Sequence, residues 1–230
     1  MEPYIILKGL VGSRLYGFAT EESDYDYRGV FVAPTEEMLS LRKPKDTLVC
    51  HEGGFVAAGA GDADVTVYEV EKFIRLAAGA NPTILELLFL PDYEILEPEG
   101  QLLVRFREAF LSNRVRETYG GYVHQQVRKL RAHEGDYFES KVRNRYAKHA
   151  RHIVRLLDQG IQLVETGELD PVVGEEKREL LYSMGDQTLE FIEQYVEDKI
   201  RQMDHGKSCL TDEPDYDKIN GVLLSIRRNN

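Results

Sequence analysis

The stretch "GSRLYGFATEESDYDYRGV" at residues 12–30 joins a glycine–serine turn to two closely spaced aspartates. It follows the β-rich run "YIILKGL" at 4–10, so Gly12 and Ser13 are expected where a strand ends and a helix begins. Such a turn presents backbone N–H groups and a hydroxyl group, which suit a phosphate. The stretch therefore predicts a phosphate-binding turn between a strand and a helix.

The two aspartates of this stretch, Asp24 and Asp26, are separated by one residue. Side chains alternate along a strand, so both carboxylates are expected on one face of the strand that continues into "YRGVFV" at 27–32. Two carboxylates this close repel each other unless a cation lies between them, and hard oxygen ligands suit Mg²⁺. An exposed edge strand with two solvated acids is the structural alternative, but the neighbouring phosphate turn favours a metal site.

The pattern of the chain changes once, near "LEPEG" at 96–100. Before this point short β-rich runs alternate with helical ones, and after it only helical periodicity remains. The sequence therefore predicts an α+β fold, with a mixed-sheet domain at 1–97 and an all-helical domain at 98–230. The expected strands are 4–10, 27–33, 47–52 and 64–70, and the expected helical segments are 36–41, 71–80, 82–89, 99–113, 121–133, 139–167, 175–203 and 215–228.

Composition limits the cellular location and the kinds of partner expected for this 230-residue chain. No apolar run approaches the length of a membrane span, and the N-terminus lacks a basic leader. The two cysteines, Cys50 and Cys209, belong to no metal-binding pattern, so reduced thiols and a cytoplasmic location are expected. A formal charge of −11 argues against a protein that coats nucleic acid non-specifically, so any polyanionic partner must meet a local basic surface.

The motif as a whole resembles that of the DNA polymerase β-like nucleotidyltransferase superfamily. The superfamily pattern is Gly-Ser, a glycine four residues after the serine, and then Ser-Asp-x-Asp. The matching residues are Gly12, Ser13, Gly17, Ser23, Asp24 and Asp26. Together with "VYEVEKFIRLAAGANPTILELLF" and "KHARHIVRLL", the motif is similar to an uncharacterised bacterial and phage subgroup associated with RNA repair.

The resemblance implies a palm-like catalytic domain and a set of site residues. The triphosphate of an NTP would lie on Gly12 and Ser13, and two Mg²⁺ ions would be held by Asp24 and Asp26. A third carboxylate on a later strand would complete the site. Asp62 and Asp64 have the same strand parity, and Asp64 is favoured because it adjoins the β-branched run "VTV".

The implied activity is the Mg²⁺-dependent transfer of a nucleoside monophosphate from an NTP to a hydroxyl group, with release of pyrophosphate. An RNA end, of tRNA for example, is the expected acceptor. One alternative is nucleotidylation of a protein, as in toxin–antitoxin AMPylation, or of a small molecule. Another is a binding module without activity, against which the intact motif argues.

The helical segment at 139–167 carries potentially cationic residues at spacings of three and four, which places them on one face. They are Lys141, Arg145, Lys148, His152 and Arg155, beside an apolar stripe of Val142, Tyr146, Ala150, Ile153 and Leu157. Three of the cations, Lys148, His152 and Arg155, match a subgroup signature and are expected to contact phosphates. A solvated basic face is the structural alternative.

The same segment fits the loose Arg-x(4–6)-His spacing of HEPN-type ribonucleases, through Arg143 with His149 or Arg145 with His152. Such a pair would act without metal, so this alternative predicts activity that survives chelation of Mg²⁺.

Overall fold

The structure is a computed structural model that describes residues 3–21, 23–50, 63–132 and 140–228. The chain forms two compact units. The first comprises the described parts of Met1–Gly79, Thr83–Phe110 and Pro214–Asn230, and the second comprises those of Ala80–Pro82 and Leu111–Glu213.

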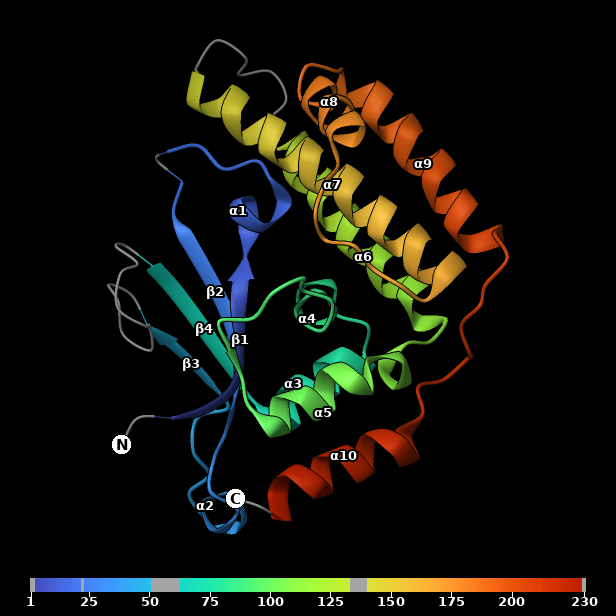
Figure 1. Cartoon of the computed structure of the whole chain (residues 1–230). Coiled ribbons are helices and arrows are strands. Elements are labelled where there is room, and N and C mark those ends of the chain that lie inside the picture. The colour runs from blue at the N-terminus through green and yellow to red at the C-terminus, as the bar shows by residue number, and fades with distance from the viewer. Residues whose placement is uncertain (1–2, 22, 51–62, 133–139, 229–230) are drawn as a thin grey trace. The chain divides into compact units, whose positions relative to one another are not determined.

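The first unit is built on a five-stranded mixed sheet (Figure 1). Its strand order is β3-β4-β2-β1-β5, in which only β2 and β4 are parallel among the described pairs. The strands are β1 (Tyr4–Val11), β2 (Tyr25–Val32), β3 (Thr47–Cys50), β4 (Ala63–Glu69) and β5 (Ile95–Leu96). The parallel pair is central, and it brings the segment after the glycine–serine turn beside β4.

Alternation along β4 fixes which face each residue occupies. Val65 and Val67 are fully buried, whereas Asp64, the second residue of the strand, is exposed. The two valines pack with Phe31 and Ala33 in a hydrophobic cluster on one face of the sheet. Asp64 therefore lies on the opposite face from this cluster.

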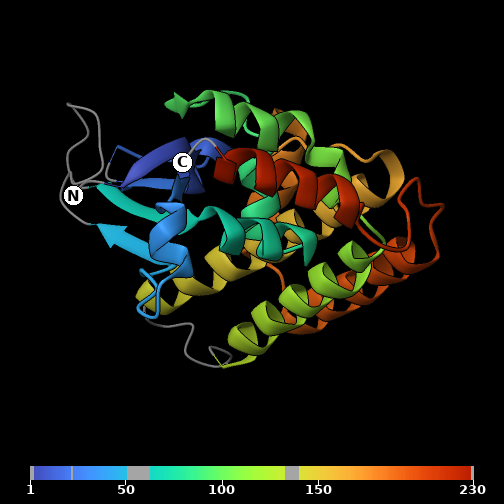
Figure 2. The ribbon, with the colours of Figure 1, turned by 90° about the horizontal axis from the view of Figure 1, so that it is seen from below.

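The helices of the first unit include the C-terminal one. Figure 2 shows α10 (Tyr216–Arg228) lying between α3 (Val70–Ala78) and α5 (Pro98–Arg105). The remaining helical elements are α1 (Gly12–Tyr16), α2 (Thr35–Leu39), most of α4 (Pro82–Leu87) and the 3₁₀ helix at Arg107–Phe110.

An ion pair joins α10 to the end of β4. Glu69 is 1% exposed, and its carboxylate lies 2.7 Å from Nη2 of Arg227. Nη1 of Arg227 also donates to the carbonyl of Ala33 at 3.0 Å. A buried carboxylate needs a cation or several donors, which Arg227 helps to supply, while the buried Ile219, Val222 and Ile226 provide the apolar contacts of α10.

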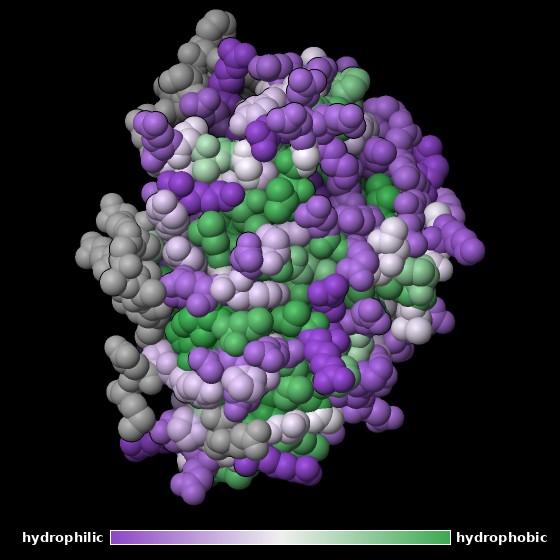
Figure 3. Space-filling model, in the orientation of Figure 1, coloured by the Kyte–Doolittle hydropathy of each residue, from purple (hydrophilic) through white to green (hydrophobic). Residues whose placement is uncertain are grey.

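The second unit is helical, with α6 (Arg114–Arg131), α7 (Ser140–Thr166), α8 (Glu175–Met184) and α9 (Leu189–His205). On α9, Ile192, Val196 and Met203 are buried, and hydrophilic residues predominate on its side seen in Figure 3. The sequence predicts one helical segment at 175–203, but the structure divides these residues between α8 and α9. Thr188 caps α9 by accepting a hydrogen bond from the N–H of Phe191, which explains the break.

The predicted α+β fold class is confirmed: a mixed sheet with helices is followed by a helical region. The compact units do not divide at 97/98, because α5, the 3₁₀ helix and α10 group with the sheet. The short strand β5 has no counterpart among the expected strands. Across the described ranges, no helix combines the length and the apolar character needed to cross a membrane.

Candidate functional site

The glycine–serine turn lies where β1 passes into α1. Gly12 has a φ of 72°, and a Cβ atom at this position would overlap the carboxylate of Asp26. Gly17 ends α1 in the left-handed conformation with a φ of 80°. Both motif glycines therefore occupy backbone conformations that favour glycine.

Asp26 and Asp64 are direct partners in the parallel ladder between β2 and β4. Partners in a ladder project to the same face, so the two carboxylates flank the same surface of the sheet. Asp26 is partly buried against Gly12, and Asp64 is exposed. Asp24 lies one residue before β2 and is exposed. The alternative third carboxylate, Asp62, lies outside the described residues.

The donor set fits a hard divalent cation in kind, because carboxylate oxygens are the ligands that Mg²⁺ prefers. Polymerase β families generally use divalent metals. The described residues do not bring three or more carboxylate, imidazole or thiol groups within reach of one ion. Asp26 and Asp64 are thus two adjacent carboxylates, and among the described residues no third group of this kind joins them.

Arg14 connects α1 to the segment that leads into β2. Its Nη2 and Nε donate to the carbonyl oxygen of Ser23 at 2.6 and 3.2 Å. The guanidinium carbon lies 3.8 Å from the centroid of the Tyr25 ring. These contacts hold the residues on both sides of Asp24.

Tyr16 anchors the other end of α1. Its hydroxyl donates to the carboxylate of Glu86 on α4, at 2.8 and 3.1 Å from the two oxygens. Glu86 is 1% exposed. A buried carboxylate that accepts a hydrogen bond from α1 fixes the position of this short helix.

Arg28 follows Asp26 by two residues on β2 and is partly exposed. Its ladder partners are Gly9 on β1 and Thr66 on β4. The alternation of the strand places Arg28 on the same face as Asp26 and Asp64. A cation is thus held beside the two acids, where an anionic group could lie.

The predicted basic face belongs to α7 in the second unit. Arg145 and Lys148 are exposed, whereas Arg155 is only 8% exposed. The side chain of Lys141 lies outside the described residues. The apolar stripe is confirmed at its four positions from Tyr146 to Leu157, which are all buried.

The buried end of this face forms a hydrogen-bonded chain. Nη2 of Arg155 lies 3.0 Å from Nδ1 of His152, and Nη1 donates to Gln159 at 3.2 Å. Burial, with the nearby Arg155 charge, lowers the pKa of His152 from 6.5 to about 3. His152 is therefore neutral at physiological pH, and its expected contact with a phosphate stays a prediction.

The alternative ribonuclease pairs are also located on α7. Arg143 is exposed and pairs with Asp186 at 2.8 Å, while Nδ1 of His149 lies 3.0 Å from Oε1 of Gln126. The second proposed pair would use Arg145 and His152, of which the first is exposed and the second is held by Arg155. The ribonuclease activity itself stays a prediction.

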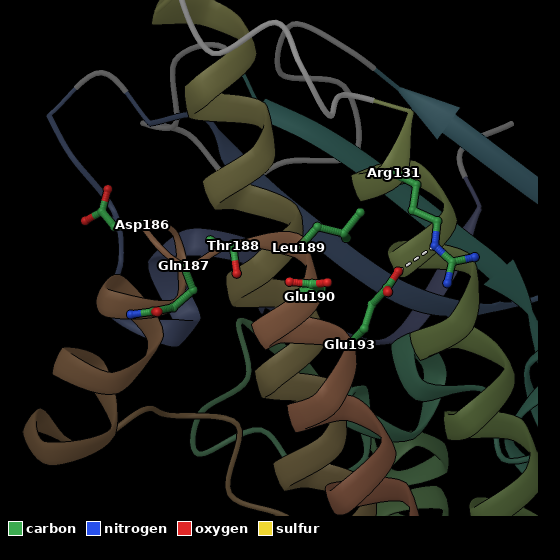
Figure 4. Close-up of a pocket in the computed structure, with 7 residues that line it drawn as sticks. All are labelled: Arg131, Asp186, Gln187, Thr188, Leu189, Glu190 and Glu193. Carbon is green, nitrogen blue, oxygen red and sulfur yellow. Dashed lines mark hydrogen bonds and ion pairs between the residues drawn. The ribbon is translucent and has the colours of Figure 1, made fainter.

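A cavity of about 740 Å³ lies within the second unit, at the start of α9 (Figure 4). Arg131 and Glu193 form an ion pair on one side of it. Three of its seven lining residues are acidic, and none of the predicted site residues belongs to it. The lining residues are Arg131, Asp186, Gln187, Thr188, Leu189, Glu190 and Glu193.

Sequence reasoning missed Arg14, Tyr16 and Glu86. Arg14 could have been noticed as the residue directly after the motif serine, but its contact with Ser23 depends on the fold of the loop between them. The hydrogen bond between Tyr16 and Glu86 joins segments that are distant in the sequence, and no local sequence pattern predicts it.

Two curated proteins are similar to this chain in sequence. It is 28% identical over 129 residues to an uncharacterised 38.9 kDa protein of Enterobacteria phage T4, a match that covers 54% of this chain and 38% of the phage protein. It is 31% identical over 101 residues to the uncharacterised protein YcgL of Bacillus subtilis, covering 43% of this chain and 36% of YcgL. The chain thus spans under two fifths of the length of these curated relatives.

A crystal structure of a nucleotidyltransferase-like protein from Exiguobacterium sibiricum aligns with 99% of this chain and 75% of its own, at a TM-score of 0.33 and 12% identity. A TM-score this low does not establish a shared fold. The family match is more extensive, because it covers residues 2–224. The chain therefore belongs to the RlaP family, described as the RNA repair pathway DNA polymerase β family.

Proposed function

We propose that the protein transfers a nucleoside monophosphate from an NTP to a hydroxyl group, most favourably at an RNA end, and releases pyrophosphate. The family is nucleotidyltransferase-like, which implies transferase activity. The observation that carries the proposal is the pairing of Asp26 with Asp64 beside the Gly12 turn.

Each part of this site has a role in the proposed reaction. Gly12 and Ser13 hold the triphosphate with backbone N–H groups and a hydroxyl group. Asp26 and Asp64, with Asp24 at the entrance to β2, hold the divalent ions. Bound Mg²⁺ would lower the pKa of the attacking hydroxyl and neutralise charge on the phosphates.

RNA is the preferred acceptor for two reasons. The family description refers to an RNA repair pathway. In addition, α7 exposes Arg145 and Lys148, so an acidic chain offers a local basic surface for phosphates. Binding of the NTP by Lys148, His152 and Arg155 stays a prediction. The neutral state of His152 favours a hydrogen-bonding role over a charge-neutralising one.

Transfer of label from each α-³²P-labelled NTP to candidate acceptors tests the proposal. The acceptors are tRNA with intact or truncated ends, short RNA oligomers, a protein extract and aminoglycosides. We expect labelled RNA with wild-type protein and Mg²⁺, and none with Asp26→Ala. Labelled protein or aminoglycoside alone would favour the alternative acceptors, and no labelled acceptor of any class would contradict the proposal.

A control variant and a control reaction in EDTA accompany this test. Glu36→Gln removes an exposed carboxylate from α2, away from the motif, and should transfer label like the wild type. RNA cleavage that persists in EDTA and depends on Arg143 or Arg145 would instead support the ribonuclease alternative.

A further inference from the structure

We propose that Arg14 is a positioning residue, which fixes the Asp24–Asp26 segment relative to the Gly12–Ser13 turn. This inference rests on the proposed function, because it concerns how the two halves of that site are aligned. The turn would hold the triphosphate and the aspartates would hold the metal, so their separation determines whether one ligand can reach both.

The short helix α1 is weak by itself. The helix contains only five residues, from Gly12 to Tyr16, and isolated helices of this length are unstable in water. Val11, its N-cap residue, makes no side-chain hydrogen bond that would stabilise the first turn. The position of α1 therefore depends on contacts with other segments.

Arg14 makes such a contact with the segment that carries the first aspartate. Two nitrogens of its planar guanidinium group donate to a single carbonyl oxygen, that of Ser23. Charged donors make stronger hydrogen bonds than neutral ones, and the rigid planar group restricts direction as well as distance. Ser23 directly precedes Asp24, so the backbone at Asp24 is held from one side.

The Tyr25 ring holds the same guanidinium group from the other side of Asp24. With the guanidinium carbon 3.8 Å from the ring centroid, the two groups are in cation–π contact. Tyr25 is the first residue of β2, and Asp26 is the second. One side chain from α1 thus contacts the residues before and after Asp24.

The acceptor of this contact is itself fixed. The N–H of Ser23 donates to the carbonyl of Thr20 at 3.1 Å, and the N–H of Thr20 donates to Oγ of Ser23 at 2.8 Å. These reciprocal bonds join Thr20 and Ser23 and restrain the direction of the Ser23 carbonyl. Arg14 therefore ties α1 to a residue that has further hydrogen bonds of its own.

The inference predicts a change in metal requirement. Without the Arg14 contacts the aspartates should be less well aligned with a bound triphosphate, so more Mg²⁺ should be needed to bind ATP. We expect Arg14→Ala to raise the half-saturating Mg²⁺ concentration about three- to tenfold, the effect of losing one or two hydrogen bonds. ATP affinity at saturating Mg²⁺ should change little.

The experiment titrates Mg²⁺ at fixed ATP and then ATP at saturating Mg²⁺, with Tm measured for each variant. Arg14→Lys keeps the charge but loses the planar pair of donors, so its Mg²⁺ requirement should be intermediate. Tyr25→Ala should act like Arg14→Ala, whereas Tyr25→Phe keeps the ring and should match the wild type. Arg75→Ala, which removes an exposed arginine from α3, is the matched control.

A weaker ATP affinity at saturating Mg²⁺ with an unshifted Mg²⁺ midpoint would overturn the inference, because Arg14 would then contact the phosphates directly. No change in either titration would also overturn it. If Arg14→Ala fails to fold, Tyr25→Ala carries the test, since its ring is 36% exposed and less needed for packing.

Asp26→Asn in the same titrations separates this inference from the proposed function. If Asp26→Asn binds ATP with an unchanged Mg²⁺ requirement, the proposed function itself fails. If Asp26→Asn abolishes Mg²⁺-dependent binding while Arg14→Ala has no effect, only the positioning role of Arg14 fails.

Discussion

Asp26 on β2 and Asp64 on β4 are directly opposite each other in the parallel ladder at the centre of the sheet. Like charges in this arrangement destabilise a sheet, and a divalent cation between them would remove the repulsion. A divalent cation bound at this pair is therefore expected to stabilise the folded chain.

The first prediction concerns this repulsion. In EDTA, Asp64→Asn should raise the free energy of unfolding by about 0.2–1 kcal/mol, because it removes one of two opposed charges. Mg²⁺ should raise the Tm of the wild type but not that of the variant. Differential scanning calorimetry with and without Mg²⁺ measures both effects. An equal Mg²⁺ response in the two proteins would count against a metal at this pair.

The second prediction concerns Gly12. Gly12→Ala should lower the free energy of unfolding by about 1–2 kcal/mol, because the residue has a positive φ and its Cβ would overlap Asp26. Label transfer should be lost as well, since the carboxylate must move. Urea unfolding followed by circular dichroism measures the stability, as the chain has no tryptophan.

Gly121→Ala provides the contrast for Gly12. Gly121 lies inside α6, is exposed, and has open space where a Cβ would be placed. This substitution should stabilise the protein by about 0.5–1 kcal/mol. A Gly12→Ala variant as stable and active as Gly121→Ala would contradict the geometry of the turn.

The third prediction concerns the ion pair that holds α10. Arg227→Met should destabilise the protein by about 3 kcal/mol, because Glu69 would be left buried without its cation. The double variant Glu69→Gln, Arg227→Met should recover part of this loss, since no charge then remains buried. Urea unfolding of the three proteins measures the difference. A loss below about 0.5 kcal/mol would show that α10 is held by other contacts.

The fourth prediction concerns pH. His152 has a pKa of about 3 in the folded chain and an ordinary value of 6.5 when unfolded, so the unfolded form binds more protons between these values. The stabilising contribution of the neutral imidazole is thus complete above pH 6.5 and is lost as the pH falls toward 3. The slope from this one residue approaches 1.4 kcal/mol per pH unit.

Urea unfolding at pH 7, 6 and 5 tests this slope. His152→Gln cannot take up the proton. The slope of its unfolding free energy against pH should therefore be smaller than that of the wild type, by the equivalent of about one bound proton. His124→Gln, which replaces an exposed imidazole on α6, is the matched control variant. Parallel pH profiles for wild type and His152→Gln would show that His152 is already accessible to protons.

Sequence periodicity predicted the sheet because burial alternates strictly along β4, where Val65 and Val67 are buried and Asp64 is exposed. Parity alone could not choose between Asp62 and Asp64. Strand register depends on pairing with β2, a long-range contact that local patterns do not contain. The ladder pairs Asp64 with Asp26.

Helical spacing correctly grouped the residues of α7 by face, but it did not indicate where packing covers that face. Lys148 is exposed and Arg155 is buried, although both belong to the same predicted row. Likewise, the sequence assigned α10 to the helical half, because nothing local in "DYDKINGVLLSIRR" reports the partnership of Arg227 with Glu69.

Isothermal titration of the wild type and of Asp26→Asn with ATP, GTP, CTP and UTP, in Mg²⁺ and in EDTA, is the most direct test of the central claim. We predict that at least one nucleotide binds the wild type in Mg²⁺, and that its heat is absent in EDTA and in Asp26→Asn. Nucleotide binding of equal strength in Asp26→Asn, or no binding of any nucleotide to the folded wild type, would contradict the claim.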